Sequence, residues 1–162
     1  MISIRDLDPG DIPEAASLTV EPGTPWHRHG LNHSEVSAIL ESGLAEEAKI
    51  LVATSGTQVV GYVWLERRGT FYHAGYIRML AVRSDQRGKD IGTALMNSAE
   101  QEVFRSSTSI FLLVSEWNEL ARAFYKKRGY VEVGKLPDYV KTGSTEIICW
   151  KTIGVIHLVP GS

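Results

Sequence analysis

The sequence has little cysteine, little net charge and no long hydrophobic run. Cys149 is its only cysteine, which excludes an intrachain disulfide and is compatible with a reducing compartment. No apolar stretch approaches the ~20 residues that a membrane-spanning helix needs. A formal net charge of −2 provides no basic field, so nucleic acid is not an expected partner.

The N-terminal segment MISIRDLDPGD also lacks the features of a secretory signal. It has acidic residues where a signal peptide has a basic start and an apolar block. These absences lead us to expect a cytoplasmic protein that acts away from membranes. The 162 residues, of which 43% are hydrophobic and 22% charged, are typical of one globular domain with one core.

Runs of β-branched and aromatic residues predict the strands of a sheet. The expected strands are residues 2–7, 49–54, 58–66, 73–83, 109–114, 130–136 and 145–153. The turn sequences SGT and RRGT separate the second, third and fourth of them, which predicts antiparallel neighbours. The continuous apolar run SIFLLV is typical of a strand that is buried on both faces.

Four further segments have the spacing of helices, with Asp11 and Asn118 as expected N-caps of the first and the last. These segments are residues 11–20, 34–49, 91–106 and 118–129. Residues 21–33 are rich in Pro, Gly and His and predict a loop. The order βααβββαβαββ predicts an α/β (α+β) fold, a mixed and mostly antiparallel sheet of about seven strands flanked by about four helices.

The stretch SDQRGKDIGTAL, residues 84–95, joins a strand to a helix through a glycine-containing turn. This arrangement directs free backbone N–H groups and the helix dipole toward an anion. A Walker loop is excluded because Asp90 follows Lys89, and the Rossmann fingerprint is excluded because only Gly88 and Gly92 are present. By itself the stretch fits two structural glycines equally well, one for a tight turn and one for close packing.

Two motifs in one order resemble the GNAT superfamily of acetyl-CoA-dependent N-acyltransferases. The usual phosphate loop of this family is R/Q-x-x-G-x-G/A, and the chain matches it at Arg87 and Gly92 but has Asp90 where glycine is usual. The second family signature, N-x-x-A-x-x-F-Y-x-x-x-G-F/Y, matches completely, at Asn118, Ala121, Phe124, Tyr125, Gly129 and Tyr130.

The resemblance extends to the order of elements and implies one acyltransferase domain over residues 1–153. It also implies that the sheet is splayed at the centre, between the strands at 73–83 and 109–115, with acetyl-CoA in the cleft. Residues 154–162 then form a tail beyond the minimal fold. Its apolar residues either pack at a homodimer contact or stay loose; they are Val155, Ile156, Leu158 and Val159.

The resemblance implies a set of cofactor contacts that are mostly made by the main chain. The backbone of Leu80, Ala81 and Val82 is expected to pair with the pantetheine arm, and Asn118 is both a helix cap and a cofactor contact. Arg87 and Lys89 either neutralise phosphate charge or are solvated surface cations. The N–H groups expected around the pyrophosphate belong to Gly88, Lys89, Asp90, Ile91, Gly92 and Thr93.

Asp90 is the one departure from the loop motif. Because the donors to phosphate are backbone groups, a side chain matters there only if it points at the anion. Asp also tolerates turn conformations better than most non-glycine residues. We expect Asp90 to face away from the phosphates and to interact with the first helical turn, where negative charge is tolerated; the alternative is weakened cofactor binding.

Acyl transfer from a thioester to an amine needs a neutral amine and a proton for the departing thiolate. An amine with a pKa of about 10.4 is neutral in only about one molecule in a few thousand at pH 7, so it must be deprotonated or desolvated. Tyr125 matches the family tyrosine near the thioester sulfur and is the candidate general acid. Its alternative role is simple packing against Phe124.

The general base is left open by the sequence. Glu66 ends a central strand and Glu116 follows the strand at 109–115, so either carboxylate can reach the cleft through a water molecule. His73 is a weaker candidate of the same kind. The alternatives are that all three are surface groups and that a chain of waters accepts the proton, as is frequent in the family.

Three histidines, His27, His29 and His33, lie close together in the predicted loop. No carboxylate or cysteine accompanies them, so we expect no metal. The segment between the first two helices lines the acceptor site in many members of the family. Trp26 and His29 are therefore candidate substrate-binding residues, and Tyr139, between the last two strands, is expected to border the same side.

The leading interpretation is an N-acetyltransferase that moves an acetyl group from acetyl-CoA to a primary amine of a small molecule or peptide, by direct attack in a ternary complex. The alternative is a non-catalytic acyl-CoA-binding regulatory module of the same fold. Intact Tyr125 favours the enzyme, whereas Asp90 and the unassigned base keep the module open. The slightly acidic composition favours cationic acceptors only weakly.

Overall fold

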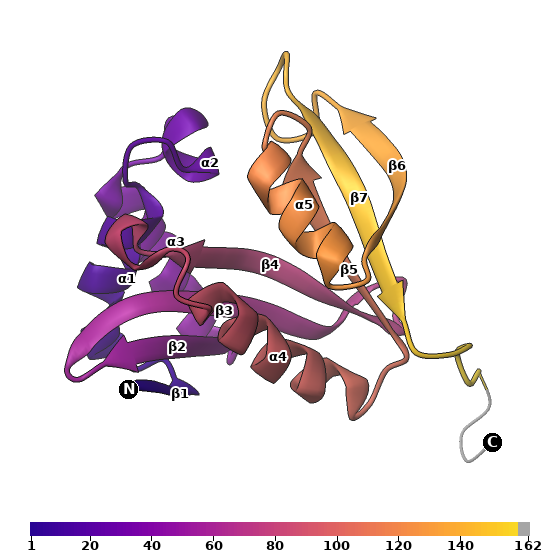
Figure 1. Ribbon diagram of the computed structural model, residues 1–162, viewed down its shortest axis with the longest axis horizontal. Helices are drawn as coiled ribbons and strands as arrows, with labels where there is room; N and C mark the ends of the chain where they lie inside the picture. The colour runs from indigo at the N-terminus through magenta and orange to yellow at the C-terminus, as the bar shows by residue number, and fades with distance from the viewer. Residues whose placement is uncertain (159–162) are drawn as a thin grey trace. The chain divides into compact units, whose positions relative to one another are not determined.

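The computed structural model describes residues 1–158 and contains the seven strands that the sequence predicts (Figure 1). They are β1 (Ile2–Asp6), β2 (Lys49–Ser55), β3 (Gln58–Thr70), β4 (Ala74–Val82), β5 (Ser109–Ser115), β6 (Val131–Pro137) and β7 (Thr145–Thr152). The α-helices of the described chain are α1 (Ile12–Thr19), α2 (Pro25–Arg28), α3 (His33–Ala45), α4 (Ile91–Phe104) and α5 (Glu119–Lys127). Two short 3₁₀ helices, η1 (Pro9–Asp11) and η2 (Ser84–Gln86), precede α1 and α4.

The strands are hydrogen-bonded in the order β1-β2-β3-β4-β5-β7-β6. The pairs β1–β2, β2–β3, β5–β7 and β6–β7 are antiparallel, and β4–β5 is parallel. This is the mixed, mostly antiparallel sheet that was predicted. The chain divides into two compact units, which we describe separately: unit 1 comprises residues 1–65 and 78–99, and unit 2 comprises residues 66–77 and 100–162.

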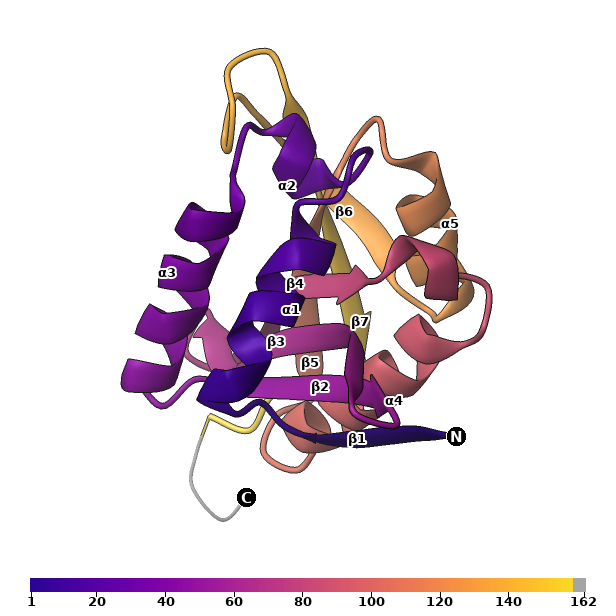
Figure 2. The same cartoon turned by 90° about the vertical axis from the view of Figure 1, so that its left-hand side faces the viewer.

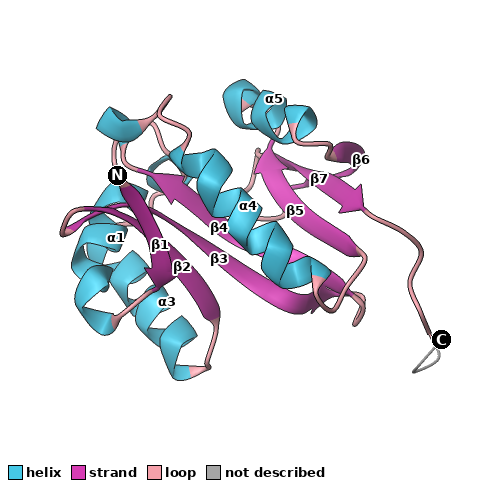
Figure 3. Cartoon of the chain, turned by 60° about the horizontal axis from the view of Figure 1, so that its bottom comes forward, coloured by secondary structure: helices cyan, strands magenta, loops and turns pink. Residues whose placement is uncertain are grey.

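Unit 1 is built around an apolar core between its sheet and two helices. Helices α1 and α3 lie side by side against β2 and β3 (Figures 2 and 3). Tyr62 and Trp64 of β3 point into this core. On the opposite face, Gly61 lets α4 approach closely, because a Cβ there would lie 2.9 Å from the carbonyl oxygen of Ala81 and 3.1 Å from Cδ1 of Leu95.

Strand β4 departs from regular alternation where it enters unit 1. Side chains of consecutive strand residues normally point to opposite faces. Here the sulfur of Met79 lies 3.9 Å from the hydroxyl of Tyr62, while the guanidinium of Arg78 lies over the ring of Trp64. Consecutive residues thus reach the same face, which indicates a local irregularity of the bulge type.

Unit 2 packs α5 against β5, β7 and β6 (Figure 1). A buried carboxylate, Glu100 on α4, holds the unit together through charge. It lies 2.9 Å from the guanidinium of Arg128 and 3.0 Å from Nζ of Lys151, and it accepts a hydrogen bond of 3.1 Å from the hydroxyl of Tyr130. On β5 and β7, Phe111 and Trp150 are cross-strand partners with stacked rings.

The hairpin between β3 and β4 differs from the prediction. The sequence RRGT was read as the turn, but β3 continues through it to Thr70. The turn is made instead by Phe71 and Tyr72, with φ of 52° and 63°. Bulky residues rarely adopt this left-handed conformation. The ring of Phe71 lies edge-on to that of Phe111, so the turn has a tertiary contact.

Two smaller predictions near the N-terminus were also wrong in part. Asp11 stands at the N-cap position of α1 as expected, but its side chain makes no capping bond; its carboxylate accepts hydrogen bonds from the amide of Asp8 and from Arg5. The predicted loop at 21–33 contains α2, whose first turn is capped by the hydroxyl of Thr24. None of the described helices is long and apolar enough to cross a membrane.

Candidate functional site

The end of β4 and the loop after it carry the residues predicted to hold the cofactor except Asn118, and these residues lie in unit 1. Leu80 and Val82 are half-buried and Ala81 is buried, so this part of the strand forms part of the packed sheet. The amide of Arg83 donates to the carbonyl oxygen of Val60 at 2.9 Å, so the chain remains hydrogen-bonded to β3 where β4 ends.

The loop between β4 and α4 is held from both sides. The amide of Ser84 donates to a carboxylate oxygen of Glu21 at 3.1 Å, and Arg83 pairs with Asp85 at 2.7 Å. This arginine holds the pKa of Asp85 below its usual range. Gly88 has a φ of +76° and open space around its Cβ position, so glycine is needed there for its backbone conformation and not for room.

Asp90 adopts the left-handed conformation, with a φ of 61°. A glycine at this position is free of strain, whereas Asp adopts it at modest cost. The carbonyl oxygen of Asp90 accepts from the amide of Ala94 at 3.0 Å, so α4 begins directly after it. Its side chain is exposed, and within residues 1–158 we find no hydrogen bond from it to the first helical turn. The expected interaction with that turn is therefore not a hydrogen bond.

The start of α4 leaves Ile91, Gly92 and Thr93 with backbone N–H groups that have no partner within the helix. The helix has 14 residues, and the positive end of its dipole lies at this turn. Lys89 is exposed and donates to the side chain of Gln86 at 3.4 Å. Unit 1 thus brings the predicted main-chain donors together in one turn.

In unit 2, Asn118 and Glu116 lie between β5 and α5. The side chain of Asn118 caps α5, because its Oδ1 accepts from the amide of Ala121 at 3.2 Å. The predicted capping role is confirmed. Glu116 pairs with Lys135 at 2.8 Å, and its backbone oxygen accepts from Arg122. The carboxylate of this candidate base therefore already has a cation beside it.

Tyr125, the candidate general acid, is buried on α5 with 8% of its surface exposed. Its ring lies edge-on to Phe124 at 5.2 Å and to Tyr130 at 5.6 Å. Burial, and to a smaller extent the neighbouring Cys149, raises the pKa of Tyr125 well above that of a free phenol, against a smaller lowering by Arg128. The hydroxyl is therefore protonated throughout the physiological range and is a donor.

The other candidate bases differ in how they are held. Glu66 lies in β3, and its side chain is so close to Gly69 that a Cβ added at Gly69 would lie 2.8 Å from the Cβ of Glu66. The backbone oxygen of His73 accepts a hydrogen bond from the hydroxyl of Ser107.

The residues predicted for the acceptor side lie in different elements. Trp26, in α2, packs against the core of unit 1. His29 ends the same helix, whereas His33 begins α3 and contacts the backbone oxygen of Pro13 through Nε2. Among residues 1–158 no group of metal-binding side chains gathers here. Tyr139 lies exposed between β6 and β7.

Sequence reasoning passed over Arg78, the one charged side chain within the apolar run of β4. A single charge in an otherwise apolar strand could have marked Arg78 as a candidate, because a strand with a covered face seldom carries a charge without a reason. The structure sets this side chain over the ring of Trp64, 4.2 Å from the ring centre.

The fold and the motifs agree with comparisons to known proteins. The model of the acetyltransferase (GNAT) family matches residues 16–130. An uncharacterized N-acetyltransferase of Methanocaldococcus jannaschii is 37% identical over 103 residues, which cover 62% of this chain but only 64% of that protein.

Solved structures show the same fold. A ribosomal-protein-alanine N-acetyltransferase from Brucella melitensis is 22% identical, with a TM-score of 0.75 over 93% of this chain and 99% of that one. An aminoglycoside 6'-N-acetyltransferase complexed with coenzyme A is 21% identical, with a TM-score of 0.76 over 96% and 99% of the two chains. From its sequence, the chain belongs to the acetyltransferase (GNAT) family.

Proposed function

We propose that the protein transfers an acetyl group from acetyl-CoA to a primary amine by direct attack in a ternary complex. Membership of the acetyltransferase family and the coenzyme A complex of a relative in fold support this assignment. The observation that carries it is the buried, protonated phenol of Tyr125 at the position of the family tyrosine. We expect the enzyme to act in the cytoplasm as one domain over residues 1–153.

The cofactor would be held chiefly by backbone groups of unit 1. The N–H groups from Gly88 to Thr93 would surround the pyrophosphate, because the left-handed residues Gly88 and Asp90 bend the chain around a concave turn. Arg87 and Lys89 would add positive charge. The backbone of residues 80–82 would pair with the amides of the pantetheine arm, and Asn118, which matches the family signature, would add a further contact.

The reaction needs two proton transfers, which different groups would perform. The amine nitrogen attacks the thioester carbonyl carbon, the carbon–sulfur bond breaks, and the departing sulfur takes the hydroxyl proton of Tyr125. The proton lost by the amine passes to Glu66, to Glu116 or to a chain of waters. Glu116 is the weaker of the two carboxylates, because Lys135 stabilises its charged form.

Replacement of Tyr125 by Phe tests the role of the hydroxyl. We expect kcat to fall by about a hundredfold or more while the Kd of acetyl-CoA stays unchanged, because a general acid contributes typically 10²–10⁴-fold. Thiol release from acetyl-CoA with a panel of amines measures the first quantity, and calorimetry measures the second.

Tyr72→Phe is the matched control, since Tyr72 is 87% exposed and lies at the hairpin tip of unit 2. Full turnover by the Tyr125→Phe variant would show that Tyr125 is not the general acid.

The second candidate function is an acyl-CoA-binding regulatory module without turnover. Asp90 favours it, because a carboxylate stands in the phosphate loop where glycine is usual. Acetyl-CoA binding detected as a thermal shift, with no thiol release from any amine or peptide tested, would establish the module and refute the enzyme. A homodimer formed through the tail would be seen by sedimentation; Val159, one of the tail residues, lies outside the described residues.

A further inference from the structure

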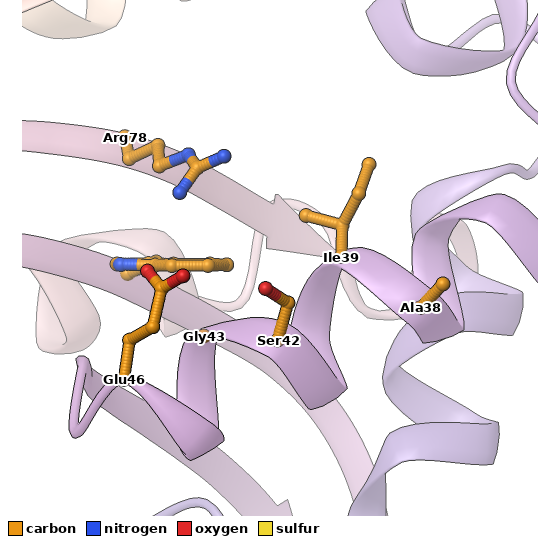
Figure 4. A pocket seen from close by; sticks show the side chains of 7 residues that line it. Ala38, Ile39, Ser42, Gly43, Glu46 and Arg78 are labelled. Carbon is orange, nitrogen blue, oxygen red and sulfur yellow. The ribbon is translucent and has the colours of Figure 1, made fainter.

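A hollow of about 330 Å³ lies on unit 1 between α3 and the strands β3 and β4 (Figure 4). Ala38, Ile39, Ser42, Gly43 and Glu46 line it from α3 and its C-terminal end, and Trp64 and Arg78 line it from the sheet. Gly43 makes this geometry, because a Cβ there would overlap the ring of Trp64. The indole therefore lies flush against the helix and forms the floor of the hollow.

Arg78 is placed differently from the ion-paired arginines of the described chain. Its guanidinium carbon lies over the indole of Trp64, 4.2 Å from the ring centre, and no ion pair between described residues includes it. A carboxylate partner is found for each of Arg5, Arg67, Arg83, Arg105, Arg122 and Arg128. The structure therefore holds the guanidinium of Arg78 against an aromatic ring and not against a carboxylate.

A guanidinium held over an aromatic ring has a specific use in recognition. The cation–π contact with the ring takes up no carboxylate, so the forked N–H donors of the guanidinium can still match the two oxygens of a carboxylate ligand. The contact also reduces the rotamer freedom that a flexible arginine would lose on binding. In Figure 4 the side chains of Arg78 and Ile39 border the same hollow, so a bound carboxylate would have an apolar neighbour for the carbon chain that follows it.

The hollow lies on the strand that the proposed function uses. Arg78 precedes Leu80 by two residues, which is about 7 Å along an extended strand. A ligand whose carboxylate rests on Arg78 can therefore extend a short carbon chain along β4 toward the segment 80–82. Glu46, the other charged residue of the lining, disfavours ligands with a second negative charge.

We propose that this hollow binds the carboxylate of the acceptor, so that the substrate class is a small amino acid whose amine is separated from its carboxylate by a short chain. This inference rests on the proposed acetyl transfer. It assigns Arg78 the recognition of the carboxylate, through an edge-on pair of hydrogen bonds, and Trp64 the orientation of Arg78. It replaces the weak expectation of a purely cationic acceptor.

A series of ω-amino acids measures the spacing directly. Glycine, β-alanine, γ-aminobutyrate, δ-aminovalerate and ε-aminocaproate are compared with alkylamines of equal carbon number, and with the aminoalkylphosphonates. We expect one length to exceed its alkylamine about tenfold or more in kcat/KM, through KM, because a charge-assisted bidentate pair is worth at least that factor. The doubly charged phosphonates should be poorer acceptors.

The variants Arg78→Met and Arg78→Lys test the assignment. Arg78→Met should abolish the preference for the carboxylate while turnover of the alkylamines is retained, and Arg78→Lys should restore it only in part. Arg68→Met, which removes an exposed cation from β3 in unit 2, is the control for a general loss of charge. A preference that persists in Arg78→Met, or no preference in the parent, would overturn the inference.

A binding measurement separates this inference from the proposed function. The amino acid series is added to the protein without acetyl-CoA and its thermal shift is recorded for the parent and for Arg78→Met. If no amine is acetylated, the proposed function fails, and a shift that depends on Arg78 still supports the carboxylate site. The absence of any such shift, with acetyl transfer to other amines intact, refutes the carboxylate site alone.

Discussion

The two compact units of the chain both bury apolar side chains, and unit 2 adds a buried charge cluster. In unit 1, α1 and α3 cover Tyr62 and Trp64 of β3. Unit 2 buries the apolar side chains of Ile110, Leu112 and Ile147, and in addition Glu100 meets two cations and a tyrosine hydroxyl. Apolar packing is tolerant of small changes but has no fixed partners, whereas a buried carboxylate has partners that cannot be exchanged.

This difference matches the proposed tasks of the two units. Unit 1 would hold its ligand through backbone groups, which need a rigid support and no particular protonation state. Unit 2 would supply a proton from Tyr125, whose environment keeps the hydroxyl protonated.

The largest expected effect comes from the charge cluster of unit 2. Glu100→Gln leaves Arg128 and Lys151 without their carboxylate, and breaking a buried ion pair from one side typically costs about 3 kcal/mol or more. Urea unfolding followed by tryptophan fluorescence measures the loss. Glu132→Gln, which removes a solvent-exposed partner of Arg122, should cost less than about 1 kcal/mol. Equal losses in the two variants would show that the buried cluster contributes no more to stability than an exposed ion pair of the same unit.

A smaller effect is expected from the core of unit 1. Gly43→Ala should lower the free energy of unfolding by about 1–3 kcal/mol, because the added methyl group overlaps Trp64 and overpacks the core. Helix propensity alone predicts the opposite sign, a gain of about 1 kcal/mol. The same urea titration decides between them. Glu41→Ala, at an exposed position of α3, is the control and should change stability little.

The prediction of the fold succeeded where residue patterns carry the local preference. The β-branched runs of β2, β3 and β5 and the N-cap Asn118 identified their elements correctly. The hairpin tip was missed because no local rule predicts Phe71 and Tyr72 in a left-handed conformation. Phe71 makes a ring contact with Phe111, a residue distant in sequence, and local patterns carry no information about such contacts.

For the site, sequence motifs identified positions whose function depends on the backbone. The loop motif marked Asp90 because glycine is usual there, and its φ of 61° gives the physical reason for that preference. No sequence motif marked the residues that line the hollow beside Arg78. This hollow depends on the approach of Gly43 to Trp64 and on the break in alternation at β4, which are properties of packing and not of sequence spacing.

The smallest expected effect concerns Asp90. Asp90→Gly should change the free energy of unfolding by less than about 1 kcal/mol, because relief of left-handed strain is offset by the added freedom of the unfolded chain. The affinity for acetyl-CoA should change less than about tenfold, or roughly 1.4 kcal/mol. Asp90→Asn removes the charge and keeps a residue that tolerates the conformation, so it separates charge from strain. A larger gain in affinity for both variants would show that the carboxylate opposes the phosphates.

The sole cysteine has a practical consequence for the assays that detect thiol release. Cys149 is buried in β7, and burial raises the pKa of its thiol to about 11. A disulfide reagent that reports thiols by absorbance reacts with thiolates, so Cys149 of the folded protein adds almost nothing to the measured absorbance. The concentration of released coenzyme A can therefore be measured even when the enzyme is as concentrated as the product. A single turnover, or its absence in a slow variant, can be detected without replacing Cys149.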